Sequence, residues 1–311
     1  MTNPLARPRV GVVLPSLAAQ REQKIDFADA ARHAEDVGLD LVAYGGRLAG
    51  DGPAVEAAVA LAAVAAATER LRICSGALAS ADRPLAWAAR QIASLAHVAG
   101  DRLVLGVDGY AEPARGGAPG ERGVWLDTAL ALLPRLLAGE RVHLPDGTGE
   151  VREAAWGLGQ VAWELGHAVP GPQVWVGGTS PAAIRRVVRS ADGWFPSLVS
   201  PDEVAAGVVR LAERAVWRGR PAPTVAVGVV GALGGGPELP GRGALAARVA
   251  AARGVAVVAL AAAPVVGGAR EAAERLHAYW GAGARHVVVG FADGDWRTQV
   301  DVLAEARALL G

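Results

Sequence analysis

The segment that decides the fold is residues 173–196, QVWVGGTSPAAIRRVVRSADGWFP. It begins with a short apolar run, Gln173 to Val176, that we expect to be a buried strand. Two glycines lead into Ser180-Pro181, and a helix is predicted over Pro181 to Ser190. A second short strand is predicted from Gly193 to Pro196. A strand, a helix and a strand in this order favour two parallel strands joined by a helical crossover.

The same alternation continues on both sides of this segment. Strands are predicted at residues 9–14, 39–44, 71–78, 103–107, 173–176, 193–196, 224–230 and 286–291. Helices are predicted after them, at residues 25–37, 53–68, 84–99, 124–138, 181–190, 201–218, 269–280 and 297–310. Residues 139–172 form a glycine-rich excursion, and residues 244–262 fit more than one element. Eight strand–helix units in a chain of 311 residues favour one closed TIM-type barrel, spanning residues 1–311, over an open sheet.

Composition excludes several classes of partner. Lys and Arg together number 31, as do Asp and Glu, so no uniform basic field for nucleic acid exists. The single cysteine, Cys74, cannot form an intramolecular disulfide. The apolar stretch from Val255 to Val266 is too short to cross a bilayer, and the N-terminal residues show no secretory pattern. We therefore expect a cytoplasmic protein that acts on a small molecule, with no nucleic-acid or membrane partner.

Six short motifs, spread in order over nearly the whole chain, carry a family resemblance. They are AEDVGLD at 34–40, ATERLRI at 67–73, AGDRL at 99–103, VWVGGTS at 174–180, ADGW at 191–194 and GAGARH at 281–286. This ordered set resembles the bacterial luciferase-like family of flavin- or deazaflavin-dependent oxidoreductases. The resemblance implies a luciferase-like (β/α)8 barrel and a homodimer. It also implies reduced FMN, for monooxygenation, or the deazaflavin coenzyme F420, for hydride transfer, acting on a small organic substrate.

The loop Gly177-Gly178-Thr179-Ser180 is the first candidate site. Glycines let the backbone approach an anion, and the start of the following helix offers free N–H groups and a positive dipole end. The resemblance implies that this loop holds the phosphate of the cofactor. The alternative reading is a tight strand–helix turn in which Ser180 serves only as the helix N-cap.

Two further strand ends are candidates for contact with the cofactor ring. The resemblance places a cis non-prolyl bond near Gly76–Ala77, behind the ring. Asp108 ends the fourth strand, where a carboxylate at the mouth of a barrel is suited to proton transfer or to hydrogen bonding a ring or substrate N–H. The alternative for Asp108 is a turn-forming residue before Gly109.

The second strand departs from the family pattern. Relatives commonly end it with an acid followed by a histidine that acts in acid–base chemistry, but this chain has Gly46-Arg47. Arg47 stays protonated, so it cannot be a general base, although it could pair with an anionic substrate. The alternative is a solvated loop residue.

Two functions therefore remain open: an oxidoreductase with Asp108 and Arg47 as catalytic residues, or a non-catalytic binding or partner subunit that has lost the histidine. A barrel lyase or isomerase acting on sugar phosphates ranks last, because no base for it is recognisable. The six histidines show no metal-binding spacing, so we predict no metal site.

Overall fold

Eight parallel strands close into a barrel in the computed structural model, which describes residues 7–45, 54–76, 85–107, 119–140, 142–145, 151–153, 171–236 and 239–311. The strands are β1 (Arg9–Val13), β2 (Leu41–Tyr44), β3 (Arg72–Ser75), β4 (Leu103–Val107), β7 (Gln173–Val176), β8 (Gly193–Trp194), β9 (Thr224–Leu233) and β11 (His286–Phe291). Each strand pairs in parallel with its neighbours in chain order, and β11 returns to pair with β1, which closes the ring. The predicted TIM-type barrel is confirmed.

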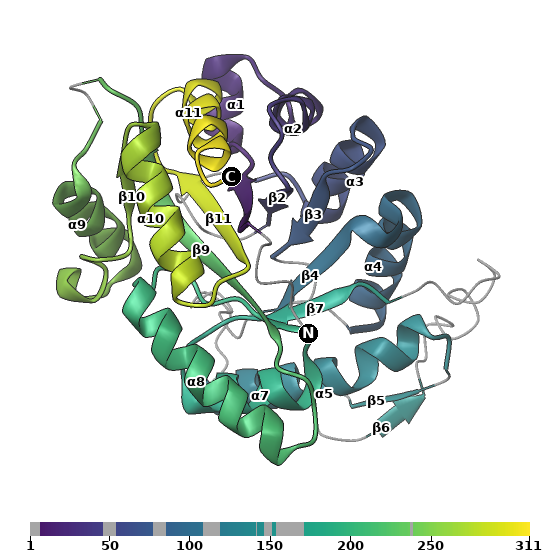
Figure 1. Ribbon diagram of the computed structural model, residues 1–311. Helices are drawn as coiled ribbons and strands as arrows, with labels where there is room; N and C mark the ends of the chain where they lie inside the picture. The colour runs from purple at the N-terminus through teal and green to yellow at the C-terminus, as the bar shows by residue number, and fades with distance from the viewer. Residues whose placement is uncertain are drawn as a thin grey trace.

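Helices surround the barrel on its outside (Figure 1). The crossover helices are α2 (Phe27–Asp36), α3 (Ala57–Ala67), α4 (Leu85–Ala99), α5 (Pro119–Leu137), α7 (Pro181–Ser190), α8 (Pro201–Trp217), α10 (Ala269–Gly281) and α11 (Trp296–Ala308). The C-terminal end of each helix lies within three residues of the end predicted from the sequence. The prediction succeeds because the apolar periodicity that defines the buried face of a helix stops where the helix ends. The helices of the described ranges include none that is both long and apolar enough to cross a membrane.

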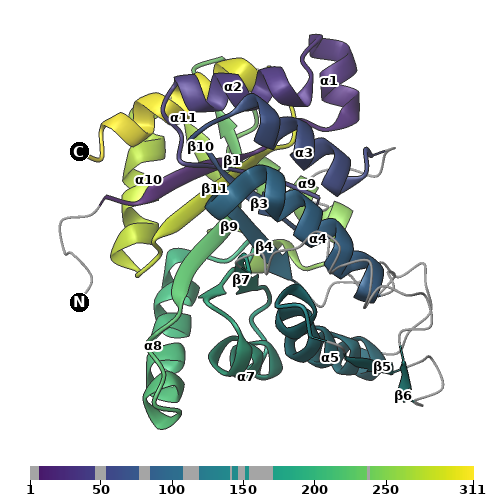
Figure 2. The same ribbon diagram turned by 90° about the vertical axis from the view of Figure 1, so that its right-hand side faces the viewer.

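Three regions differ from the sequence prediction or complete it. A short helix that was not predicted, α1 (Leu17–Gln23), precedes α2 and is capped by Ser16. The ambiguous stretch becomes α9 (Arg242–Arg253) and a 3-10 turn (Val257–Ala259), followed by β10 (Val265–Gly267), which pairs with the far end of β9 outside the ring. The excursion contains an antiparallel hairpin, β5 (His143–Pro145) and β6 (Val151–Glu153), which lies beside α5 (Figures 1 and 2). Residues 141, 146–150 and 154–170 of the excursion lie outside the described residues.

The barrel interior is built in layers of four residues, taken from alternate strands, because successive residues of a strand point to opposite faces. From the N-terminal end, the strand register gives a polar layer of Arg9, Arg72, Gln173 and Thr224, and then a layer of Leu41, Val104, Gly193 and His286. Two further layers follow, first Gly11, Cys74, Trp175 and Ala226, and then Ala43, Gly106, Phe195 and Val288. The buried apolar members of these layers form a cluster of their own, separate from the core between strands and helices.

Two tryptophans fix the barrel from opposite sides. Trp175 lies inside it, fully buried, with its ring 5.6 Å from that of Phe195. Trp194 faces outward against α8, where a Cβ added to Gly207 would lie 2.1 Å from the indole ring. Both tryptophans therefore pack the barrel, and glycine at position 207 is what allows α8 to approach.

Candidate functional site at the barrel mouth

The C-terminal mouth of the barrel is lined largely by glycine. Above Phe195, the strand register and the backbone ladder place Val13 with Gly76, Gly177 and Gly228 in the next inward-facing layer. Gly290, on β11, occupies the level after that. These glycines contribute no side chain, so the upper wall presents mainly backbone. A flat ring can approach such a wall closely.

The loop after β7 presents unpaired backbone N–H groups at this mouth. Gly178, Thr179 and Ser180 are exposed, and their amides, like that of Ala182, have no hydrogen-bond acceptor in the part of the chain that the structure describes. Gly178 has φ +87°, a left-handed conformation that glycine adopts without strain. Together with the N-terminus of α7, these amides form a site suited to a phosphate.

Gly177 and Ser180 have defined structural roles in the same loop. The Gly177 amide donates to the Val107 carbonyl at 2.9 Å, so it continues the barrel ladder and is not available to a ligand. The Ser180 hydroxyl accepts from the Ala183 amide at 3.2 Å, which makes Ser180 the N-cap of α7. The capping role and the anion-binding role are compatible, since the cap uses the hydroxyl as an acceptor and leaves the Ser180 amide free.

Contacts beneath the loop hold it in place. The Trp194 indole donates to the Gly178 carbonyl at 2.8 Å, which anchors the loop to the barrel wall. Arg186 of α7 makes a two-point ion pair with Asp127 of α5, at 3.0 and 3.1 Å. Burial alone would raise the pKa of Asp127, but its hydrogen bonds with Arg186 and Arg189 outweigh this effect and lower it. The α7 N-terminus is therefore fixed before any ligand arrives.

The ring side of the predicted site is only partly within the described residues. Gly76 donates its amide to the Tyr44 carbonyl at 3.0 Å and faces the mouth. Ala77 lies outside the described residues, so the expected cis bond between the two does as well. Cys74, one layer deeper, is fully buried, and burial raises the pKa of its thiol to about 12. Cys74 therefore remains a neutral, buried thiol.

The two predicted catalytic residues, Asp108 and Arg47, also lie outside the described residues. Among the inward-facing mouth residues that the structure does describe, none carries a carboxylate or an imidazole. The described mouth thus supplies binding groups, and any acid–base group must come from the neighbouring loops.

Ser197 is a mouth residue that the sequence did not reveal. Its hydroxyl lies 2.9 Å from where a Cβ of Gly228 would stand, and it faces solvent at the end of β8. Leu198 next to it has φ +60°, a left-handed conformation that is unfavourable for leucine, and it is held there by the hydrogen bond that its backbone N–H donates to the Gly228 carbonyl at 2.7 Å. No sequence signal marks this turn, because leucine is not a residue expected at positive φ.

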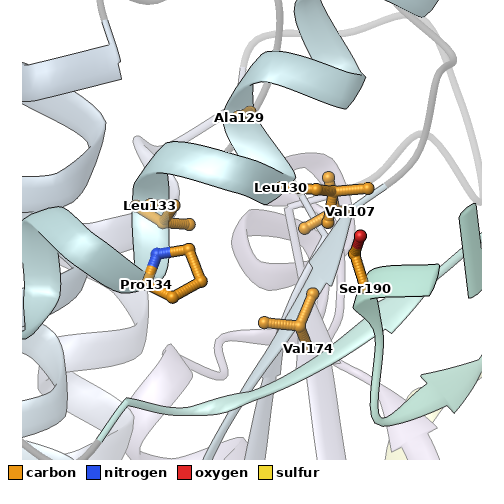
Figure 3. A pocket seen from close by; sticks show the side chains of 7 residues that line it. All are labelled: Val107, Ala129, Leu130, Leu133, Pro134, Val174 and Ser190. Atoms are coloured by element: carbon orange, nitrogen blue, oxygen red, sulfur yellow. The ribbon is translucent and has the colours of Figure 1, made fainter. Parts of the chain in front are cut away.

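A pocket outside the barrel is not part of this site (Figure 3). It lies between α5 and the outer faces of β4 and β7, and is lined by Val107, Ala129, Leu130, Leu133, Pro134, Val174 and Ser190. Apart from Ser190 its lining side chains are apolar, so it offers no chemistry. In the described ranges, no group of three His, Cys, Asp or Glu side chains could hold a metal ion.

The fold and the loop after β7 define a (β/α)8 barrel with a candidate anion-binding mouth, and comparison with known proteins gives its family. The family model for luciferase-like monooxygenases matches residues 9–234. The chain belongs to this family. No curated protein sequence matches it significantly.

Solved structures with the same fold include enzymes of two cofactor types. An F420-dependent secondary alcohol dehydrogenase, solved with an F420–acetone adduct, superposes with a TM-score of 0.76 at 15% identity, covering 98% of this chain and 99% of that chain. The F420-dependent tetrahydromethanopterin reductase from Methanopyrus kandleri gives 0.71 at 15% identity, covering 98% and 100%. The oxygenating constituent of 3,6-diketocamphane monooxygenase from Pseudomonas putida, solved with FMN, gives 0.71 at 15% identity, covering 97% and 98%. At these identities the likeness establishes the fold.

Proposed function

We propose that this protein is a cytoplasmic oxidoreductase that binds reduced FMN or coenzyme F420 at the barrel mouth and acts on a small organic substrate. The observation that carries the proposal is the row of unpaired amides at Gly178, Thr179, Ser180 and Ala182, beside a barrel wall made mostly of glycine. Family membership supports the same reading, because its solved neighbours include enzymes of both cofactor types.

Each part of the proposed site has a distinct task. The amides after β7 bind the cofactor phosphate, and the dipole of α7 favours its negative charge. The wall at Gly76 receives the ring, with Ala77 and Asp108 as the predicted neighbours of the ring edge. When bound, the cofactor supplies either monooxygenation, as FMN, or hydride transfer, as F420, while the protein orients it and excludes water. Asp108 is the proposed proton-transfer group, and Arg47 the proposed partner of an anionic substrate.

Cofactor titration of matched glycine variants tests the proposal. Gly178→Glu places a carboxylate among the phosphate-binding amides, and we expect affinity for FMN or F420 to fall by about 100-fold or more through charge repulsion and lost amide contacts. Gly219→Glu is the control, since Gly219 also has a positive φ of 61° and a Cβ there would meet nothing within 4 Å. Absorbance and fluorescence titrations with each cofactor give the affinities. Equal affinities in Gly178→Glu and Gly219→Glu would refute the site.

The second candidate is a non-catalytic binding or partner subunit of the same family. It is favoured by Gly46-Arg47 in place of the expected acid and histidine, and by the absence of carboxylate and imidazole groups among the described mouth residues. This candidate predicts that the protein binds a cofactor without turning it over. If Asp108 supplies the proton chemistry instead, Asp108→Asn will remove turnover of the reduced cofactor and leave its affinity within a few-fold of the wild type.

We also propose a homodimer, which contacts its second copy through α3. This helix contains only Ala, Val and Leu, and Val59 on its outer face is 64% exposed. An apolar outer surface on a helix is typical of an interface that a partner covers. Val59→Lys should shift the mass measured by light scattering toward that of the monomer. Val209→Lys, on the outer face of α8, is the control and should leave the mass unchanged. A monomeric wild type would contradict the proposal.

A further inference from the structure

The N-terminal floor of the barrel contains an arginine that forms no ion pair with a described carboxylate. Arg72 is half-buried, donates to the Gln173 side chain at 2.8 Å, and lies 5.9 Å from the centre of the Trp175 ring. It makes no ion pair with any carboxylate of the described residues, and burial and Arg9 lower its pKa by more than the charge of Asp101 raises it. Burial lowers the pKa of Arg72, and the neighbouring charge of Arg9 lowers it further. A partly desolvated guanidinium without a paired carboxylate is unfavourable, so this layer carries an excess of positive charge.

Two buried polar atoms above that layer also lack partners. The Trp175 Nε1 and the His286 Nδ1 have no hydrogen bond, although Trp175 is fully buried and His286 is only 5% exposed. Their rings lie 4.8 Å apart. Buried polar atoms of native proteins are nearly always satisfied, by protein groups, water or an ion.

The two rings lie over one part of the floor. Trp175 Nε1 lies over β8, 2.9 Å from where a Cβ of Gly193 would stand, and His286 is on β11. Between these strands runs β9, whose inward-facing floor residue is Thr224. The absence of a side chain at Gly193 leaves the indole N–H uncovered from that side. The Thr224 hydroxyl has no hydrogen bond to the described residues either.

The chemistry of these groups selects an anion. Trp175 Nε1 can only donate, and the two arginines of the floor layer are cations. Burial, followed by the charges of Arg72 and Arg9, lowers the pKa of His286 to about 3, so its ring is neutral and carries one N–H donor. Acceptors are scarce, because the Gln173 carbonyl oxygen is already used by Arg72. A bare cation would be repelled, and a bulky anion would meet the closed layers of Leu41, Val104 and Trp175.

We propose that the floor of the barrel binds a small monovalent anion of the halide class, held by the Trp175 indole N–H, His286 and the Thr224 hydroxyl in the positive field of Arg72 and Arg9. The anion compensates the half-buried guanidinium, and its effect is on stability, since the N-terminal face of such barrels serves the fold and the C-terminal face the chemistry. The site is independent of the function proposed for the mouth.

Thermal unfolding in bromide tests this site. Bromide is varied at constant ionic strength against gluconate, which is too large to enter. At ten times its dissociation constant, bromide shifts the unfolding equilibrium about 11-fold toward the native state, which corresponds to a rise in Tm on the order of 2–4 °C. Arg72→Gln should abolish the rise, and Thr224→Val should reduce it. Arg70→Gln removes the same charge from an exposed position nearby and should retain it.

Diffraction from crystals grown in bromide provides the second measurement. An anomalous peak beside Trp175, His286 and Thr224 is expected in the wild type and should be missing in Arg72→Gln. The proposal is overturned if the peak is absent and only ordered water satisfies the indole, or if bromide raises the Tm of Arg72→Gln and Arg70→Gln equally. The latter result would show general screening of surface charge instead of a site.

Discussion

The two ends of this barrel are made from the same eight strands and differ in nearly every physical property. At the C-terminal mouth the inward positions are mostly glycine, and four amides after β7 are unpaired and open to solvent. Above the N-terminal floor Trp175 fills the interior, and polar atoms there are buried without protein partners in the described residues. The mouth has surplus backbone donors, while the floor has surplus side-chain donors.

The difference shows how one barrel can place a proposed binding site at one end and the packing that stabilises the fold at the other. A glycine wall cannot contribute much hydrophobic burial, so the energy that holds the barrel closed comes from the lower layers and from the helices outside. The mouth can then keep donors free for an anionic ligand, because it is not needed to hold the strands together. Three changes test whether the two ends are independent in this sense.

The largest effect is expected from Trp175→Ala. This change removes the largest side chain of the interior and leaves a space that the rigid strands cannot fill, so the free energy of unfolding should fall by about 3–5 kcal/mol. Trp217→Ala is the control, since Trp217 is 89% exposed and its loss should change stability by less than about 0.5 kcal/mol. Urea unfolding of both variants measures the difference. Similar stabilities for the two variants would mean that the floor is not the closed end.

A pH effect of intermediate size is expected from His286. An unfolded histidine has a pKa near 6.5, whereas burial lowers the pKa of His286 to about 3 in the folded protein. Between these values the unfolded chain binds a proton that the folded chain does not. The contribution of His286 is therefore complete above about pH 6.5 and is lost as the pH falls toward about 3, at roughly 1.4 kcal/mol per pH unit.

The histidine effect is isolated by a difference measurement. Urea unfolding at about pH 7 and about pH 4.5 should show that the wild type loses on the order of 2–3 kcal/mol more than His286→Gln. Acid also weakens the folded state through three carboxyl groups whose pKa values are lowered, those of Glu35, Asp127 and Asp295. Their contribution is the same in both proteins, so it cancels in the difference between them. Parallel pH profiles for the two proteins would show that His286 is solvated.

The smallest effect compares one glycine from each end. A Cβ at Gly193 would lie 2.5 Å from the Trp175 ring, which is fully buried in the closed interior, so Gly193→Ala should cost about 1–3 kcal/mol. A Cβ at Gly228 would lie 2.9 Å from the Ser197 hydroxyl, which is exposed and can rotate away. Gly228→Ala should therefore cost less than Gly193→Ala in thermal unfolding. A larger cost at Gly228 would contradict the view that the mouth is the adaptable end.

Local sequence signals predicted most of the elements but not their detailed roles. Ser180-Pro181 and Ser200-Pro201 marked two helix starts correctly, because N-caps act within one turn. The glycine-rich loop after β7 was also readable, since strand, glycines and helix follow one another directly. By contrast, Gly177 was predicted to bind the anion, yet its amide serves the ladder with Val107. That partner is 70 positions away in the chain, and no local pattern reveals it.

The sequence by itself determined the alternation of strands and helices, the barrel class and the family, because periodicity and motifs are properties of neighbouring residues. Only the tertiary structure decided which residues share a layer. It brought Arg72 and Thr224 into the polar floor layer and stacked His286 and Trp175 in the two layers above them, and it placed Ser197 beside Gly228 through a left-handed leucine. The physical reason is the stagger of strands in a closed barrel, which sets residues from distant segments side by side and is fixed only when the ring closes.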